Sequence, residues 1–354
     1  MAFLRSSGIV VLTGLLLLCS CGLPPTLIAP NGPLATYPVH AYVAVGDSIT
    51  YGAYLSSPTT QSYPALIAYS RHWTGNNYAI GGDMACDVFP RQITPNRVAF
   101  SPSSGAVYSI LIGTNDADTY GIGDYDSIFS NCQLAAITWL ATRPEDKLFP
   151  GDTSVIPSGA CTNSVSNGAF TCLGPGALDF GSIKTTGAPL YLWYTVSDAA
   201  SSDDTFTVSI DGTLTTLDVK PRVSLTTGKG STSSIYLLRA PLSAGLHHVQ
   251  LTTRATNVSI LALASNRSSK PVVVAVGDIP NQLLTNPIAS VASQLAYTQI
   301  SRQNVETAIS DGLDVRAVND RDYMLGTSAE MHDQLHPNFQ GQVNLAVAFA
   351  SQLP

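Results

Sequence analysis

Charged residues are scarce in this chain of 354 residues. They make up 12% of it, with 17 Lys and Arg against 24 Asp and Glu, so the formal net charge is −7. No cluster of Lys or Arg would neutralise a row of phosphates, which argues against nucleic acid as a partner. Hydrophobic residues make up 45%, a composition typical of a globular protein with a neutral surface rather than a disordered chain.

The sequence also lacks the motifs of a metal site and of an α/β-hydrolase. No Cys-x-x-Cys pair or Cys/His cluster has the spacing of a metal site, so we expect neither a metal ion nor another cofactor. No Gly-x-Ser-x-Gly motif occurs, which disfavours an α/β-hydrolase with a nucleophile elbow.

The N-terminus has the pattern of an export signal. Arg5 is the only charge before the apolar run 8–18, which is too short for a comfortable membrane span. The following Leu18-Cys-Ser-Cys21 resembles a bacterial lipobox, in which Cys21 becomes the acylated first residue. An ordinary secretory cleavage nearby is the alternative. We therefore expect a signal peptide at 1–21 and a Pro-rich, uncharged tether at 22–38. The protein would be exported, and bound to a membrane through Cys21 if the lipobox is used.

Four cysteines follow the predicted signal peptide at 1–21, and an even number in an exported protein predicts disulfides. Three pairings are possible. The short loop between Cys161 and Cys172 favours that pair, and Cys86–Cys132 would then join two core elements. In the alternative interpretation, Cys132 is a buried thiol on a helix face.

Short apolar runs alternate with helical patterns in two parts of the chain. We expect strands at 41–45, 77–80, 107–112, 271–276 and 313–318, and helices at 63–72, 126–142, 290–310 and 337–352. This order predicts an α/β fold, a three-layer sandwich around a five-stranded parallel sheet, formed by residues 39–149 and 269–354. In such a sheet the sites form at the carboxyl ends of the strands.

Between these two parts the pattern changes to a period of two. Phe206, Val208 and Ile210 alternate with polar residues, and Asp211-Gly212 predicts a hairpin turn. We expect a separately folded β-sandwich at 150–268 that tunes substrate choice.

Four short motifs supply the groups that a hydrolytic site needs. Ser48 follows the first strand and is a candidate nucleophile, which requires a base to take its proton. The Gly82 amide and the Asn115 side chain can donate to an oxyanion. His336 is the candidate base, with Asp333 three residues earlier to orient it. Each motif alone is common in turns and helix caps, so the combination carries the interpretation.

These motifs resemble those of the SGNH hydrolases, also called GDSL esterases or lipases. The Ser, Gly, Asn and His of the family name match Ser48, Gly82, Asn115 and His336 in family order. The resemblance covers about residues 41–142 and 271–352, whereas the insertion is a departure from the compact family pattern.

The resemblance implies a flavodoxin-like SGNH fold and ester hydrolysis by Ser48, His336 and Asp333. The oxyanion hole would consist of the Ser48 amide, Gly82 and Asn115. SGNH enzymes act on lipids, simple acyl esters and acetylated sugars, and the neutral insertion favours acylated carbohydrate or another cell-surface ester. Two alternatives stay open, a lipase or lysophospholipase and a non-catalytic, glycan-binding surface lipoprotein.

Several further residues have two interpretations. Asp47, Asp83 and Asp116 are expected to support the site by loop hydrogen bonds, and His332 to lie on its rim. Tyr191 and Trp193 would form an aromatic platform for a sugar ring or belong to the core of the insertion. His247-His248 would bind a metal ion or, as we favour, lie at the end of a surface strand.

Overall fold

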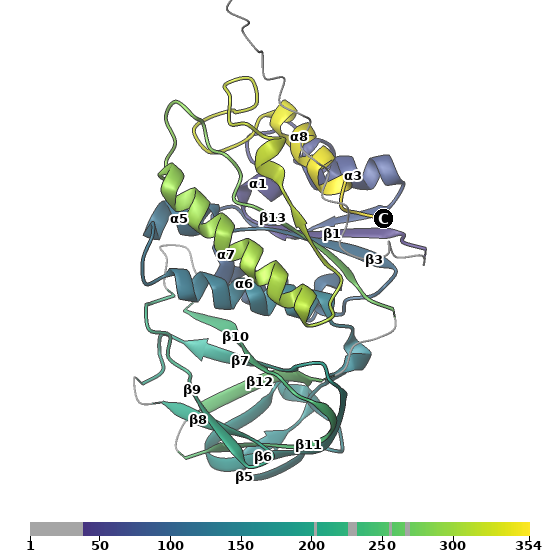
Figure 1. The fold of residues 1–354 in the computed structure, drawn as a ribbon, viewed down its shortest axis with the longest axis vertical. Helices are drawn as coiled ribbons and strands as arrows, with labels where there is room; N and C mark the ends of the chain where they lie inside the picture. Colours follow the sequence, from purple (N-terminus) through teal and green to yellow (C-terminus); the bar gives the residue numbers. More distant parts are fainter. Residues whose placement is uncertain (1–37, 202–203, 226–231, 255–256, 266–269) are drawn as a thin grey trace, which may run out of the picture.

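The computed structural model describes residues 38–201, 204–225, 232–254, 257–265 and 270–354. The predicted signal peptide, Cys21 and all of the tether except Pro38 lie outside these residues. An α/β part and an all-β part are stacked on each other (Figure 1). In the part of the chain that the structure describes, no helix is both long and apolar enough to cross a membrane.

The α/β part is built on a five-stranded parallel sheet with the order β14-β13-β3-β1-β2. Its strands are β1 (Ala41–Gly46), β2 (Thr74–Asn77), β3 (Ala106–Leu111), β13 (Val273–Gly277) and β14 (Val315–Val318). Every residue of β3 and β13 is buried, as in central parallel strands that helices cover on both faces. The predicted α/β fold with five parallel strands is confirmed.

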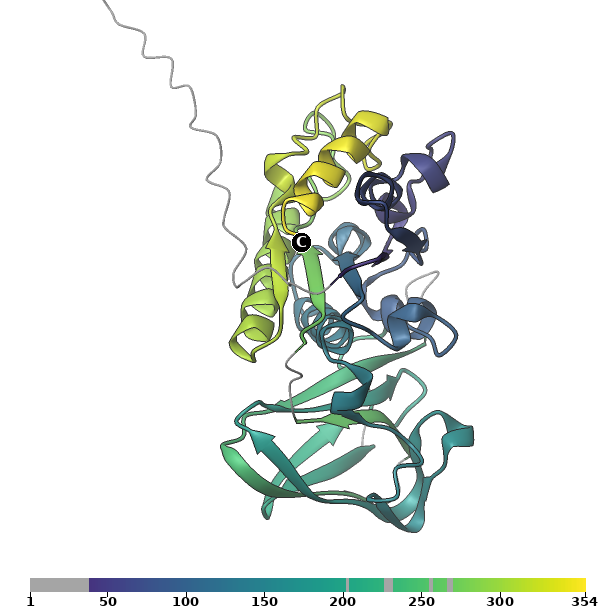
Figure 2. The ribbon, with the colours of Figure 1, turned by 90° about the vertical axis from the view of Figure 1, so that its right-hand side faces the viewer.

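Helices cover both faces of this sheet (Figure 2). One face packs against α3 and α8, and the other against α4, α6 and α7. The helices are α1 (Ser48–Tyr51), α2 (Pro58–Gln61), α3 (Tyr63–Arg71), α4 (Ala85–Gln92), α5 (Thr114–Tyr120), α6 (Asp126–Ala141), α7 (Val291–Ser310) and α8 (Phe339–Ala350).

The second strand lies earlier than predicted, at Thr74–Asn77 instead of 77–80. β2 is an edge strand of exposed or half-buried residues, so it has no apolar run to mark it. Residues 78–80 form a loop instead, which stays close to β1 because the amides of Tyr78 and Ile80 donate to Ala44 and Gly46.

The inserted part is a nine-stranded antiparallel sheet with the order β10-β7-β12-β6-β11-β8-β9, where β4 pairs with β12 and β5 with β6. The strands are β4 (Lys147–Leu148), β5 (Ile156–Asn163), β6 (Phe170–Thr186), β7 (Leu190–Ser197), β8 (Thr205–Ile210), β9 (Thr213–Asp218), β10 (Ser233–Ala240), β11 (Ala244–Thr253) and β12 (Asn257–Ala264). The inserted all-β domain is confirmed, as is the hairpin turn at Asp211-Gly212 between β8 and β9. One continuous sheet bends so that its two halves face each other (Figures 1 and 2).

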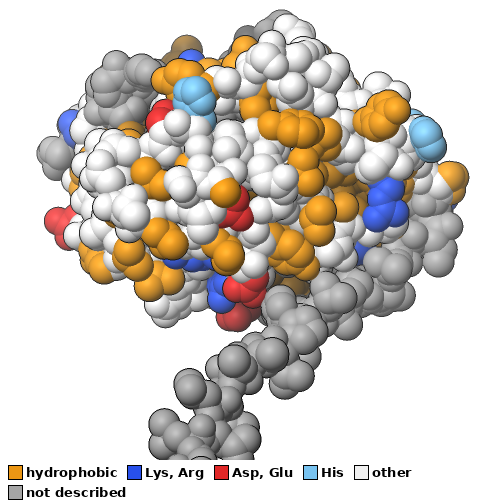
Figure 3. All heavy atoms as spheres, turned by 90° about the horizontal axis from the view of Figure 1, so that it is seen from above, with side chains coloured by type: hydrophobic (Ala, Val, Ile, Leu, Met, Phe, Trp, Pro, Cys, Tyr) orange, Lys and Arg blue, Asp and Glu red, His pale blue; other side chains and the backbone are white. Residues whose placement is uncertain are grey.

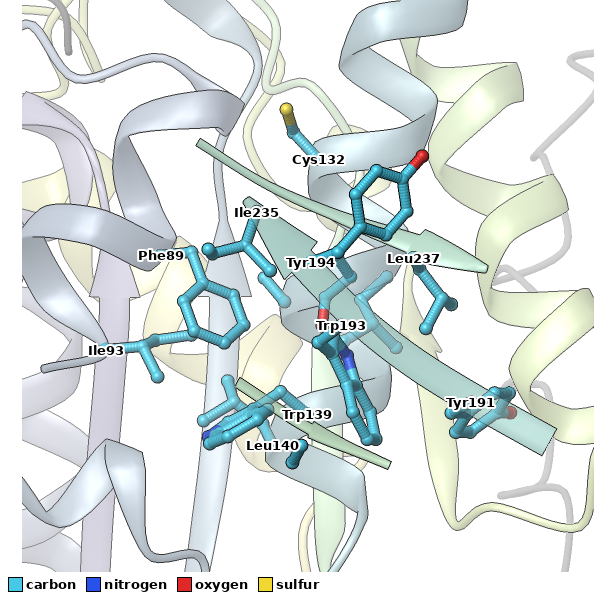
Figure 4. Close-up of a cluster of buried hydrophobic side chains, with 14 of the residues drawn as sticks. Phe89, Ile93, Cys132, Trp139, Leu140, Tyr191, Trp193, Tyr194, Ile235 and Leu237 are labelled. Carbon is cyan, nitrogen blue, oxygen red and sulfur yellow. Dashed lines mark hydrogen bonds between the residues drawn. The ribbon is translucent and has the colours of Figure 1, made fainter. Parts of the chain in front are cut away.

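The insertion shares its apolar core with the α/β part, and Figure 4 shows the junction. Trp193 packs edge-on against Trp139 of α6, with ring centroids 5.2 Å apart, and its indole N–H donates to the Ala135 carbonyl at 3.1 Å. The Tyr191 hydroxyl donates to Asp311 Oδ2 at 2.6 Å. Both aromatic side chains are fully buried. The aromatic platform proposed for them is therefore wrong, and the core interpretation holds.

Polar contacts strengthen this junction. The Ser234 hydroxyl of β10 donates to the Cys86 carbonyl at 2.7 Å. The Lys147 ammonium donates to the carbonyls of Trp139 and Thr142 at 3.0 and 2.6 Å, and burial holds its pKa well below the usual range. One apolar core thus spans both parts, and separate folding of the insertion stays a prediction.

Both favoured disulfides are confirmed. Cys86–Cys132 joins α4 to α6, and Cys161–Cys172 joins the neighbouring strands β5 and β6.

Candidate active site

Ser48 is the first residue of α1, just beyond the carboxyl end of β1. Asp47 caps this helix, because its Oδ1 accepts a hydrogen bond from the Ile49 amide at 2.9 Å. A side chain on Gly46 would collide with Thr50 and with the Leu111 carbonyl of β3. Glycine is thus required for β1 to lie against β3 immediately before the candidate nucleophile.

A loop before α8 brings Asp333 and His336 to the same edge of the sheet. It is closed by a bridge between Met331 and Pro337 and by the His332 amide, which donates to the His336 carbonyl at 2.8 Å. Asn338 then caps α8 by accepting from the Gly341 amide. The predicted helix start at Pro337 is therefore two residues early.

The three predicted triad residues lie in hydrogen-bonding contact. Ser48 Oγ is 3.0 Å from His336 Nε2, and His336 Nδ1 is 2.9 Å from Asp333 Oδ2. Ser48 is 8% exposed and the His336 side chain 14%, so the contact is largely shielded from water. With Nδ1 protonated toward Asp333, Nε2 is free to accept the serine proton.

Asp333 is fixed by more than the imidazole. Its Oδ1 accepts from the amides of Leu335 and His336 at 2.8 and 2.6 Å. Partial burial alone would raise the pKa of Asp333, but these two amides and the His336 ring outweigh it, so the pKa lies below its usual range. The Asp333 carboxylate therefore stays ionised near neutral pH.

The Gly81-Gly82 loop lies beside the candidate nucleophile. A Cβ on Gly81 would be 3.7 Å from the Ser48 Cβ, and Gly82 has a φ of +85°, which favours glycine. Among the described residues, no acceptor takes the amide proton of either Ser48 or Gly82. Both amides are available to a substrate oxygen.

Asn115 follows the carboxyl end of β3, as Ser48 follows the carboxyl end of β1. It is the second residue of α5, and its side-chain Nδ2 donates to the Asp83 carbonyl at 2.9 Å. This bond leaves the second N–H of the amide for another acceptor. The structure thus joins Asn115 to the Gly82 loop directly.

Two buried glutamines that sequence reasoning missed hold these loops together. Gln92 accepts from the Gly46 amide at 2.8 Å and donates to the Gly46 carbonyl and to Asp83 Oδ2 at 2.7 and 2.8 Å. Gln342 of α8 donates to the Ile49 carbonyl at 2.9 Å and accepts from the Tyr63 amide at 2.8 Å. The only sequence signal was a polar residue within a helix whose other buried residues are mostly apolar.

Three buried carboxyl groups lie behind the loops, as expected for Asp47, Asp83 and Asp116. Asp116 accepts from the Ala85 amide, and Asp83 pairs with Arg91 as well as Gln92. Burial raises the pKa of Asp47 to about 7, of Asp116 to about 8 and of Asp83 to about 6. They support the loops while carrying less negative charge near neutral pH than ordinary carboxylates.

The remaining histidines have other surroundings. His332 is exposed and lies against Tyr54 beside His336, which agrees with a rim position. His247 and His248 lie in β11 and pair with Asp211 and Asp179. Within the described ranges, no three His, Cys, Asp or Glu side chains gather in a group that could hold a metal ion.

Comparison with known proteins finds no matching family model and no match among curated proteins. Solved structures are similar at low identity. A lipolytic protein of the G-D-S-L family from Veillonella parvula is 10% identical, with 88% of this chain and 96% of that chain covered and a TM-score of 0.40. A carbohydrate acetylesterase from Sinorhizobium meliloti is 12% identical, with 88% and 97% covered and a TM-score of 0.36.

A two-domain esterase active on acetylated mannans, co-crystallised with mannopentaose, is 9% identical, with 65% of this chain and 92% of that chain covered and a TM-score of 0.35. At these levels the likeness says nothing about what this chain binds or cleaves.

Proposed function

We propose that this protein is a serine esterase that hydrolyses carboxylic esters through Ser48, His336 and Asp333. The observation that carries the proposal is the line of contacts from Ser48 Oγ to His336 Nε2 and from His336 Nδ1 to Asp333, at 3.0 and 2.9 Å. Serine is a weak nucleophile until such a base takes its proton.

In the acylation step, Ser48 Oγ attacks the ester carbonyl carbon while its proton passes to His336 Nε2. The carbonyl oxygen becomes an oxyanion that accepts hydrogen bonds from the Ser48 and Gly82 amides and from Asn115 Nδ2. When the tetrahedral intermediate collapses, the alcohol leaves with the proton from His336, and Ser48 remains acylated.

Deacylation repeats these roles with water. His336 takes a proton from the attacking water, the same three donors hold the second oxyanion, and the acid leaves as Ser48 recovers its proton. Asp333 orients the imidazole throughout and stabilises its cationic form. The scheme needs only residues of this chain and water.

For the substrate, we propose acylated carbohydrate or another neutral cell-surface ester. The chain has 12% charged residues, and Figure 3 shows a face on which charged side chains are few and scattered among uncharged ones. Such a surface suits a neutral substrate better than an anionic one. Two disulfides support an oxidising compartment outside the cytoplasm.

The test is hydrolysis of p-nitrophenyl acetate by the purified protein and by Ser48→Ala. The variant should lose about 10⁴-fold or more in kcat with an unchanged melting temperature, because only the nucleophilic oxygen is removed. An organophosphonate ester should also label Ser48 stoichiometrically, as peptide mass spectrometry would detect. If Ser48→Ala kept more than about a tenth of the activity, Ser48 would not be the nucleophile.

Two outcomes would favour the alternatives. A folded protein that hydrolyses no ester but binds glycan would be a non-catalytic surface protein. A preference for long-chain acyl esters presented in micelles would indicate a lipase. For the anchor, mass spectrometry of the mature N-terminus in the native host would decide between an acylated Cys21 and an unmodified terminus.

A further inference from the structure

An exposed tyrosine lies over the proposed base. The Tyr54 ring is stacked on His332, with centroids 4.9 Å apart and an interplanar angle of 11°. It also meets His336 edge-on, with centroids 4.9 Å apart and an angle of 69°. Tyr54 nevertheless remains 65% exposed, so it does not belong to the core.

The backbone conformation at Tyr54 is unusual for this residue type. Its φ is +64°, in the left-handed region that non-glycine residues seldom adopt. The turn before it is held at the candidate nucleophile, because the amides of Gly52 and Ala53 both donate to the Ser48 carbonyl, at 3.0 and 2.9 Å. Backbone strain of this kind concentrates at ligand sites. The Tyr54 ring buries little area, so its packing does not offset the cost of this backbone strain in the folded protein.

The shape and polarity of this surface select among ligands. The Tyr54 ring, which contacts His336, offers a flat apolar surface, and the Tyr54 hydroxyl and the exposed His332 ring add hydrogen-bonding atoms at its edge. The neighbouring carboxyl groups are already engaged, Asp333 by His336 and Asp118 by Gln282 at 2.6 Å. A pyranose ring, with an apolar C–H face and a rim of hydroxyls, fits this combination. A long acyl chain would need an aliphatic channel instead.

We propose that Tyr54, supported by His332, is a stacking platform for the sugar ring of an acylated carbohydrate whose ester group lies at Ser48. This inference rests on the proposed esterase function and names its substrate class. Tyr54 contacts the sugar, whereas His332 is a positioning residue that holds the tyrosine ring in place.

The experiment compares three substrates: a monoacetylated methyl glucopyranoside, p-nitrophenyl acetate and p-nitrophenyl butyrate. Tyr54→Gly removes the ring and suits the positive φ, so the fold should be kept. Tyr54→Phe keeps the ring, and Tyr69→Ala removes an 83% exposed tyrosine from α3 as a matched control.

For the acetylated sugar, Tyr54→Gly should raise KM roughly three- to tenfold, the range of one aromatic stacking contact, with a smaller change in kcat. The ratio of kcat/KM for the sugar ester to kcat/KM for p-nitrophenyl acetate should fall by the same factor. Tyr54→Phe should retain most of this ratio, and Tyr69→Ala should retain all of it.

Several results would overturn the platform. An unchanged ratio in Tyr54→Gly would show that the ring binds no sugar. A raised KM for the butyrate alone would make Tyr54 part of an acyl site, and an equal fall of kcat on all three substrates would make it a support for His336. If the unaltered protein hydrolysed none of them, the esterase function itself would fail, and the platform with it.

Discussion

Replacing Asp333 by asparagine should abolish most of the activity without loosening the loop that carries His336. Asp333 Oδ1 accepts from two backbone amides, those of Leu335 and His336. In Asp333→Asn the amide oxygen has to stay at this position, because an NH₂ group cannot accept either bond. The NH₂ group then replaces Oδ2, which lies 2.9 Å from His336 Nδ1.

This exchange reverses the tautomer of the imidazole. His336 Nδ1 also lies 3.1 Å from Oδ1, but that oxygen already accepts two amides and the NH₂ group at the shorter distance needs an acceptor. Nδ1 is therefore expected to accept, and the ring proton moves to Nε2, which faces Ser48 and can no longer take its proton. We expect kcat to fall by about 10⁴ near neutral pH, which corresponds to about 5 kcal/mol in the activation free energy.

The assay is the steady-state hydrolysis of p-nitrophenyl acetate, with melting temperatures measured in parallel. Asp124→Asn, at an exposed position, is the matched control and should behave like the unaltered protein. Asp333→Ala should lower the melting temperature as well, because it also removes the acceptor of both amides. If Asp333→Asn retained more than about a tenth of kcat, the orienting role of Asp333 would be refuted.

Three further predictions concern pH and the junction between the two parts. Activity should fall on acidification, because a histidine base acts only in its neutral form while the lowered pKa of Asp333 keeps that carboxylate ionised. A flat profile from about pH 5 to 8 would exclude a histidine base. The pKa of about 7 at Asp47 lies above its value of 3.8 in an unfolded chain, so stability from this group is full at acid pH and lost as the pH rises through 7. The melting temperature of Asp47→Asn relative to the unaltered protein should therefore rise between about pH 4 and 7 and level off above that, and a constant difference across this range would count against the buried, protonated state. Trp193→Ala should cost about 3–5 kcal/mol of the free energy of unfolding, measured by urea denaturation with Trp193→Phe as the milder control, whereas a cost below about 1 kcal/mol would argue against the shared core.

The proximity of the residues in the candidate site could be predicted from the sequence because each motif is local. Ser48 and Asn115 directly follow apolar strands, and Asp333 is three residues from His336, so short-range patterns place them at one edge of the sheet. The glutamines could not be found in this way. Gln92 contacts Gly46 across 46 residues of sequence, and Gln342 contacts Ile49 across 293. No periodicity encodes such contacts.

The relation between the insertion and the α/β part was missed for a different reason. The pattern at 126–142 predicts that α6 is a helix but not how far it is covered, and most residues from Cys132 to Ala141 are buried. A helix that is buried almost all round needs a second layer to cover it. Here that layer is β7 and β10 of the insertion. A period-two pattern identifies these strands but does not show that one face of them packs on a helix of the other part.

The hydrogen bonds of Gln92 fix the two loops of the candidate site relative to each other before a substrate binds. One amide group bonds to the turn before Ser48 and to the loop of Gly82 at the same time. Separating the two loops would break several hydrogen bonds at once in a site from which water is excluded. Their relative position is therefore set when the protein folds and not when an ester arrives. In the proposed mechanism, donors that are already aligned need no reorganisation as negative charge develops on the carbonyl oxygen.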